Sequence, residues 1–326
     1  MIKVNPQPNN QNGLTLVEVL VAMVLGTFLI GSVLEVYLGS RHTNVMQDNL
    51  SELQENGRAA MDILSKDIRM AGFHGNSGFR TLAVSFVNPL PITPSVDTLI
   101  SGVDSGQPNY WTAAQQAAVV PETDVITVLH AQPCGGKLQP PGMLNRSSNI
   151  PISATAANDC NINVNDVLFI SNGVNADIFR ATNSGSTAVS HARFSTFYAI
   201  DSELFNYVMN SYYIGLGVSN RPSLFRYDNT RATADELIEG IENMQLTYGI
   251  DTDAVGGTPN YYVTADGIGL NAQNIVSVHI SLLVSSSAEV AQQPVAYSFN
   301  NQSIMPNDRR LRKVFSTTIS LRNRLN

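Results

Sequence analysis

The feature that most constrains this chain is an apolar segment near its N-terminus, LTLVEVLVAMVLGTFLIGSVL at residues 14–34. It contains one charged residue, Glu18, and none from Val19 to Leu34. About 20 apolar residues span the hydrocarbon core of a bilayer as a helix. The segment therefore predicts a single membrane-spanning helix.

Three interpretations compete for this segment. A cleaved secretory signal has a shorter apolar region followed by a small-residue cleavage site, whereas Ala22 lies inside the apolar run with no such site after it. An ordinary anchor has no need of a carboxylate, which costs on the order of 3 kcal/mol at the centre of a membrane helix. Glu18 lies about one turn past Gly13, near the interface, and there the cost is smaller.

The third interpretation comes from the residues around Gly13. Gly13, followed by LTLVE and a charge-free run, resembles the class III signal of type IV prepilins, with Leu14 in place of the usual phenylalanine. The resemblance implies that a membrane peptidase removes residues 1–13 as a leader peptide and that the new amine of Leu14 is methylated. It also implies that Glu18 pairs with the Leu14 amine of an adjacent subunit, since two partly desolvated charges are costly alone and acceptable together.

The helix is expected to continue beyond the membrane as an amphipathic stalk. No proline occurs between Pro8 and Pro89, so nothing forces the helix to stop. Apolar or small residues recur in steps of three and four, at Met46, Leu50, Leu53, Gly57, Met61, Leu64 and Ile68. This predicts one helix over residues 14–72, roughly 85 Å long, which spans the membrane over 14–34 and is amphipathic over 35–72. A long coiled coil is the alternative, although the stripe covers only about three heptads.

The residues at the end of this helix indicate which group of pilin-like proteins the chain resembles. The segment LQENGRAAMDILSKDIRMAGF, residues 53–73, resembles PilW-type minor pilins of type IV pili, and J-type pseudopilins of type II secretion are the related alternative. The resemblance implies an α+β, type IV pilin-like fold, in which the long N-terminal helix packs on a β-rich globular head. Glycine is a poor helix former, so Gly57 is expected to permit close packing.

Residues 73–326 are expected to form the head, outside the cytoplasm. Short β-branched runs separated by turn residues predict strands at 124–131, 166–173, 176–182, 211–218, 222–228, 274–286 and 311–324. Residues 235–244 are expected to be a short helix or the start of a strand, and residues 86–122 to form long loops. No internal repeat or second domain boundary is evident.

The chain has two cysteines, Cys134 and Cys160. They predict a structural disulfide in an oxidising compartment, worth roughly 3.5 kcal/mol in the chain-entropy model. Two unrelated buried thiols are the alternative. The five histidines are scattered and have no metal-ligand spacing.

The sequence gives no support for catalysis. It has no G-x-S-x-G, H-E-x-x-H, phosphate-loop or C-x-x-C motif, so we expect no enzyme activity, cofactor or small-molecule substrate. Asp251-Thr252-Asp253 is interpreted as a polar turn because further calcium ligands are missing. The net charge is -7, and the basic tail favours a solvated or subunit-facing edge over nucleic acid. Its cations are Arg309, Arg310, Arg312, Lys313, Arg322 and Arg324.

By resemblance, the chain is expected to be a minor pilin that primes or caps a type IV pilus and so supports twitching motility and adhesion. It would span the inner membrane once, with a periplasmic head, before entering the pilus at the cell surface. The implied partners are other minor and major pilins, the prepilin peptidase and the assembly platform. A membrane-tethered periplasmic enzyme or binding protein is the remaining alternative. It predicts no cleavage after Gly13 and tolerance of replacements at Glu18.

Overall fold

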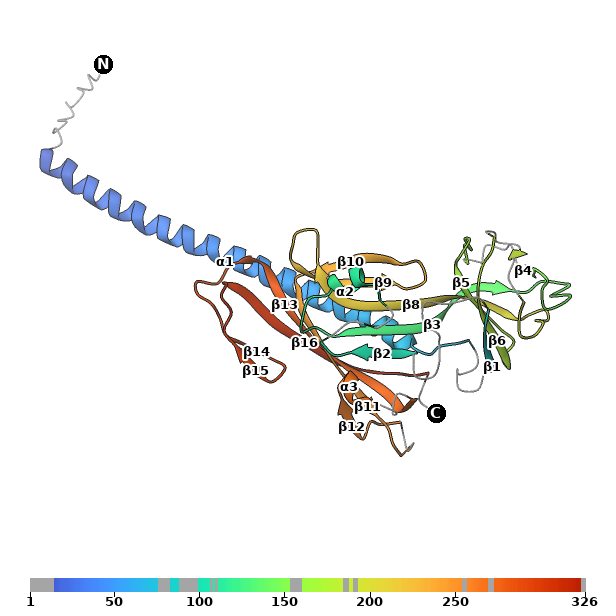
Figure 1. The fold of residues 1–326 in the computed structure, drawn as a ribbon. Coiled ribbons are helices and arrows are strands. Elements are labelled where there is room, and N and C mark those ends of the chain that lie inside the picture. Colours follow the sequence, from blue (N-terminus) through green and yellow to red (C-terminus); the bar gives the residue numbers. More distant parts are fainter. Residues whose placement is uncertain are drawn as a thin grey trace, which may run out of the picture.

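A long helix and a β-rich head make up the protein (Figure 1). The computed structural model describes residues 15–75, 83–87, 99–105, 108, 111–152, 160–183, 188–189, 193–253, 257–268 and 273–323. Helix α1 runs from Leu16 to Met70, and its N-terminal half projects away from the head. Two short helices, α2 (Ala113–Ala117) and α3 (Ala265–Ile268), lie in the head. The fold is α+β and pilin-like, as expected.

The larger sheet is built around a long strand, β8. Its strand order is β1-β6-β5-β8-β3-β2, and β8 also pairs with β9, which pairs with β10. The first residues of β8 pair with β5 and its last residues with β9, so this one strand connects the two ends of the head. The bounds are β1 (Ala83–Val87), β2 (Ile100–Val103), β3 (Val125–Lys137), β5 (Val167–Ser171), β6 (Asn175–Arg180), β8 (Glu203–Leu216), β9 (Pro222–Asp228) and β10 (Thr233–Glu239).

The second sheet has four antiparallel strands in the order β12-β11-β13-β16. Two small two-stranded sheets, β14-β15 and β4-β7, accompany the larger ones. The bounds are β4 (Ile150–Pro151), β7 (Ala188–Val189), β11 (Ile241–Ile250), β12 (Tyr261–Val263), β13 (Ile275–Glu289), β14 (Tyr297–Phe299), β15 (Gln302–Ile304) and β16 (Arg310–Ser320).

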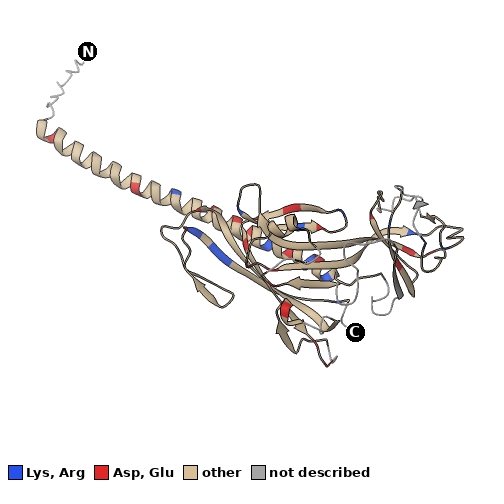
Figure 2. Ribbon diagram, viewed as in Figure 1, with Lys and Arg blue, Asp and Glu red and all other residues tan. Residues whose placement is uncertain are grey.

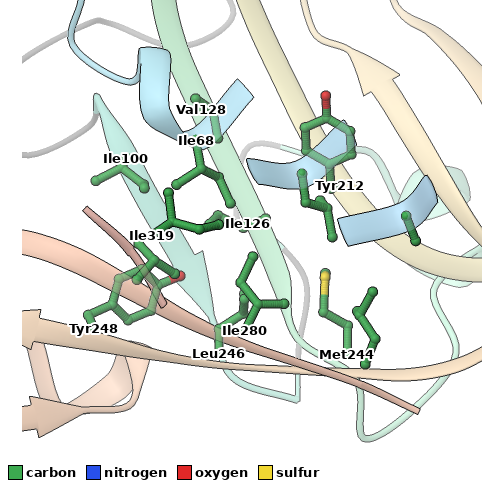
Figure 3. Close-up of a cluster of buried hydrophobic side chains, with 14 of the residues drawn as sticks. Ile68, Ile100, Ile126, Val128, Tyr212, Met244, Leu246, Tyr248, Ile280 and Ile319 are labelled. Carbon is green, nitrogen blue, oxygen red and sulfur yellow. The ribbon is translucent and has the colours of Figure 1, made fainter. Parts of the chain in front are cut away.

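The main core lies where α1 meets both sheets. Ile68 of α1 belongs to one cluster with Ile126 of the larger sheet and Ile319 of the four-stranded sheet, and all three side chains are fully buried (Figure 3). Burying aliphatic side chains of this size stabilises a fold by about 1.5–3 kcal/mol each. The C-terminal half of α1 is therefore a structural part of the head.

A second apolar cluster lies at the end of the head farthest from the exposed part of α1 (Figure 1). The disulfide between Cys134 and Cys160 is part of this cluster, together with Leu138, Phe179 and Tyr198. The covalent link ties the end of β3 to the segment that precedes β5.

The predicted elements agree with most of the structure. All seven predicted strands are present, although the strand predicted at 211–218 begins as early as Glu203. Residues 235–244 form strands β10 and β11, joined at Gly240, and no helix. The region 86–122, expected to form loops, contains β2 and α2 among its described residues.

The predicted stripe on α1 is correct only from Leu53 onward. Met46 and Leu50 are exposed, whereas Asn49 is buried. Ala60 is fully buried where Met61 was expected. The stripe is therefore narrower and begins later than its apolar periodicity predicts.

Candidate assembly interface

The N-terminal half of α1 is an apolar surface without a partner in this chain. No residue from Leu16 to Asp48 is buried, and large side chains such as Phe28 are 78% exposed. Among the described residues, α1 is long and apolar enough to cross a membrane. Isolated soluble proteins rarely expose so large an apolar surface, so this half is made to be covered by lipid or by other subunits.

Glu18 lies at the start of this surface and caps its own helix. Its carboxylate accepts hydrogen bonds from the backbone N–H of Thr15 (3.1 Å) and from the Thr15 hydroxyl (3.1 Å). The Thr15 Oγ1 in turn accepts one from the Glu18 N–H at 3.3 Å. This reciprocal capping box satisfies donors that a helix leaves free at its N-terminus. Gly13 and Leu14 lie outside the described residues, so the structure gives no geometry between Glu18 and Leu14.

The head first contacts α1 at Asn49. The Asn49 side-chain oxygen accepts hydrogen bonds from the Ser287 hydroxyl and the Ala288 N–H, both at 3.1 Å. The Ser287 hydroxyl also lies 2.6 Å from the Glu52 carboxylate. These polar contacts hold the end of β13 against the helix at the point where α1 leaves the head.

About two turns beyond Asn49, at Gly57, the helix and the four-stranded sheet come into close contact. A Cβ atom built on Gly57 would lie 2.6 Å from both Cδ2 and Cζ of Phe315 on β16. Real Cβ atoms do not approach a ring carbon so closely. Glycine at this position therefore allows the Phe315 ring to pack directly on the helix backbone, as the sequence led us to expect.

A buried polar network fixes the last turn of α1 to the larger sheet. The Asp67 carboxylate accepts hydrogen bonds from His130 Nε2 (2.8 Å), the Tyr212 hydroxyl (2.8 Å) and the Asn210 amide (3.1 Å). Burial by itself raises the pKa of Asp67, but the hydrogen bonds and the charge of His130 outweigh it and hold this pKa below its usual value. Removing one partner of such a network leaves another polar group unpaired.

The end of α1 is closed by groups from two other parts of the chain. Gly72, at φ +74°, donates its N–H to the Leu129 carbonyl of β3, and its carbonyl accepts from His74 Nδ1 at 2.9 Å. The Asn323 amide, just after β16, lies 3.3 Å from the Ala71 carbonyl. Burial lowers the pKa of His74 to about 4, so this ring is neutral near pH 7.

Within the described ranges, no group of three His, Cys, Asp or Glu side chains could hold a metal ion. Asp251 accepts a hydrogen bond from the Asp253 N–H at 3.1 Å, within a turn.

Some basic side chains of the C-terminal tail are already paired within the chain, and so are less available to a binding partner than the sequence suggests. Arg312 is only 8% exposed at its side chain and forms ion pairs with Glu242 (2.6 Å) and Asp308 (2.7 Å). Arg309 pairs with Glu289. Part of the tail therefore stabilises the four-stranded sheet.

Asn49, Asp67 and His130 were not predicted as structural anchors. Asn49 occupies a position on the buried stripe, which a search for apolar residues overlooks. Asp67 and its partners are separated by 63 to 145 residues, so no local pattern connects them.

Comparisons with known families agree with this geometry at both ends of the chain. Residues 211–323 match the family model of the type IV pilus-assembly protein W, and residues 8–34 match the prokaryotic N-terminal methylation motif. No curated protein and no solved structure matched the chain.

The first match covers β9 to β16 and most of the surface on which α1 packs. The second covers the capped, exposed start of α1, which fits a single-pass membrane anchor that later lies in the pilus. The chain is thus similar to the type IV pilus-assembly protein W over residues 211–323 and to the N-terminal methylation motif over residues 8–34, which is consistent with a type IV minor pilin of the PilW family.

Proposed function

We propose that this protein is a minor pilin that acts in the priming or tip complex of a type IV pilus, and so supports twitching motility and adhesion. The observation that carries the proposal is the division of α1 at Asn49. Before Asn49 the helix has no buried residue and is apolar up to Leu34, and from Asn49 onward it is fixed to the head by buried contacts. A subunit of this form inserts its free helix among other helices and carries its head on the outside.

The proposal includes the processing expected from the sequence. Residues 1–13 are removed, the Leu14 amine is methylated, and Glu18 pairs with the Leu14 amine of a neighbouring subunit. The capping box supports this arrangement because it directs the Glu18 carboxylate toward the N-terminal end of α1. Other pilins, the prepilin peptidase and the assembly platform are the partners, and the head works without catalysis.

Mass spectrometry of fibres sheared from cells tests the proposal. We expect a chain that begins at N-methylated Leu14, in amounts well below those of the major subunit. Detection of the processed chain in the cell envelope and not in sheared fibres would favour a secretion pseudopilus or a priming role at the base of the fibre. An uncleaved chain beginning at Met1, in cells with an active prepilin peptidase, would refute the pilin function altogether.

A further inference from the structure

The four-stranded sheet ends in a long strand with one unpaired side. β16 pairs with β13 in continuous register from Arg312 to Ser320. Across the ranges that the structure describes, no other strand pairs with β16. A typical strand has about five or six residues, so this edge is unusually long. Its free N–H and C=O groups form a template on which a further strand can pair.

The usual protection of an edge strand is weak here. Natural edges are shortened, bent by bulges, or interrupted by proline and charge. β16 contains neither proline nor glycine, and its only register shift lies at its beginning. Its centre, residues 314–319, is uncharged and rich in β-branched residues. Val314 is 36% exposed on this strand. Such an edge invites aggregation unless a partner covers it.

The charges along the edge indicate what kind of partner fits. Arg310 donates to the Ser286 carbonyl at 2.8 Å, and Lys313 lies 5.4 Å above the Phe315 ring. Within the described ranges, neither of these cations nor Arg322 forms an ion pair with a carboxylate, unlike Arg309 and Arg312. Figure 2 shows basic residues gathered at the start of this strand. Cations therefore flank an uncharged centre.

A groove beside this edge has an uncharged lining. The groove, of about 440 Å³, begins at Val314 and runs across β13 and β11 beneath the β14-β15 hairpin. His279, Ser281 and Phe299 contribute to its lining, which contains no carboxylate, lysine or arginine. Because the groove lining carries no charge, neutral side chains of an added strand can cover it without burying a charged group.

We propose that β16 is the docking site for an extended segment of a partner protein, neutral at its centre and acidic at both ends, which adds to the sheet as a fifth strand. Main-chain hydrogen bonds supply the affinity of this binding mode and the side chains supply its specificity. A second copy of this chain fits less well. Pairing β16 with another β16 would bring two copies of Lys313, which has no carboxylate partner within the described ranges, onto one seam, where like charges are destabilising. The inference does not depend on the proposed function.

Peptide binding to the full-length protein in detergent tests the proposal. The probe is a peptide as long as Arg312–Ser320, with valine and threonine alternating and glutamates at both ends. A matched peptide carries lysines at its ends, and a third has proline at its centre. Peptide affinity is measured by fluorescence anisotropy at low salt, and protection of the β16 amides by hydrogen exchange. We expect the glutamate peptide to bind about tenfold more tightly than the lysine peptide and to protect β16 amides, and the proline peptide to do neither.

Two variants locate the site. Lys313→Glu should weaken binding of the glutamate peptide about threefold or more. Lys137→Glu makes the same charge change on β3 of the other sheet, where the lysine is exposed, and should leave binding unchanged. Equal effects of the two variants, equal binding of the acidic and basic peptides, or no protection of β16 would overturn the proposal. Protection of β16 that rises with protein concentration in the absence of peptide would also overturn it, in favour of a second copy.

Discussion

Two carboxylates at opposite ends of α1 lie in very different surroundings. Glu18 is exposed and bonds only to the first turn of its own helix in the described chain. Asp67 is enclosed by three donors from the larger sheet. The first group is available to a neighbouring molecule, whereas the second is fully used in holding the head to the helix.

Replacing Glu18 separates two roles of its carboxylate. Glutamine can maintain the capping box but carries no charge. Alanine removes both the capping hydrogen bonds and the charge, and the lost cap costs about 1 kcal/mol of helix stability. If the charge pairs with a neighbouring amine, Glu18→Gln and Glu18→Ala should both strongly reduce the amount of this protein in sheared fibres. The measurement compares fibre and whole-cell amounts. Recovery of Glu18→Gln at the wild-type level would leave capping as the only role.

The lowered pKa of His74 predicts that the folded head loses stability in mild acid. Its pKa falls from 6.5 to about 4 on folding, so the unfolded chain binds a proton more readily between these values. His74 therefore removes stability as the pH falls from 6.5 toward 4, by roughly 3 kcal/mol. In His74→Gln, this dependence should disappear, and the variant should gain stability relative to the wild type over that range. Urea unfolding followed by the single tryptophan, Trp111, measures it.

Asp124 changes the folding stability with pH in the opposite direction to His74. The variant must therefore be compared with the wild type at each pH. Burial raises the pKa of Asp124 to about 6, despite hydrogen bonds from the N–H groups of Ser105 and Leu246. The folded state therefore binds this proton first, and Asp124 adds stability as the pH falls below 6. The pH dependence of the wild type alone would hide part of the His74 effect. A constant difference between His74→Gln and wild type from pH 7 to pH 4 would contradict the prediction.

At the scale of elements, the contact between α1 and β16 depends on a missing side chain. Gly57 costs about 1 kcal/mol of helix propensity against alanine, and in return the Phe315 ring packs against the helix backbone. The helix accepts a local penalty because a larger side chain would separate it from the sheet. This is a case in which tertiary packing overrides local preference.

Gly57→Ala should therefore destabilise the head by about 1–3 kcal/mol, since the new Cβ overlaps the Phe315 ring. Phe315→Leu in the same chain should recover part of the loss, as expected of residues in direct contact. Gly39→Ala is the matched control because nothing lies within 4 Å of its Cβ position, and it should be neutral or slightly stabilising. Equal urea midpoints for Gly57→Ala and Gly39→Ala would show that the packing at position 57 is not limiting.

At the scale of the whole molecule, the apolar half of α1 contributes nothing to the stability of the head. The first buried residue of the helix is Asn49, and Leu53 is the first apolar residue in the core. The fold of the head should therefore be independent of the membrane-spanning segment.

A chain that begins at Ser40 should thus be soluble without detergent and unfold at the same urea concentration as the full-length head. A chain that begins at Arg58 should be less stable by at least the 2–5 kcal/mol typical of a lost core leucine, about the cost of removing Leu53. Trp111 fluorescence and circular dichroism compare the two. Aggregation of the chain that begins at Ser40 would mean that residues 16–39 support the head.

The sequence allowed the fold class, most strands and the long helix to be predicted, because periodicity and turn residues are local signals. It did not allow the partners of Asp67 to be predicted, since His130 and Tyr212 reach it only through sheet pairing. Arg312 was expected to be solvated or to face another subunit, and its burial depends on Glu242 from a strand two positions away in the sheet. Electrostatic partners brought together by topology leave no spacing rule in the sequence.

The free length of α1 also sets how far the head stands from the lipid. A bilayer core is about 30 Å thick, which about 20 residues of helix cross. With residues 14–34 as the proposed membrane span, residues 35–48 would form a helical spacer of roughly 20 Å between the membrane and the head contact at Asn49. Such a spacer would hold the head clear of the lipid headgroups before assembly and leave the exposed part of α1 next to it open to neighbouring subunits.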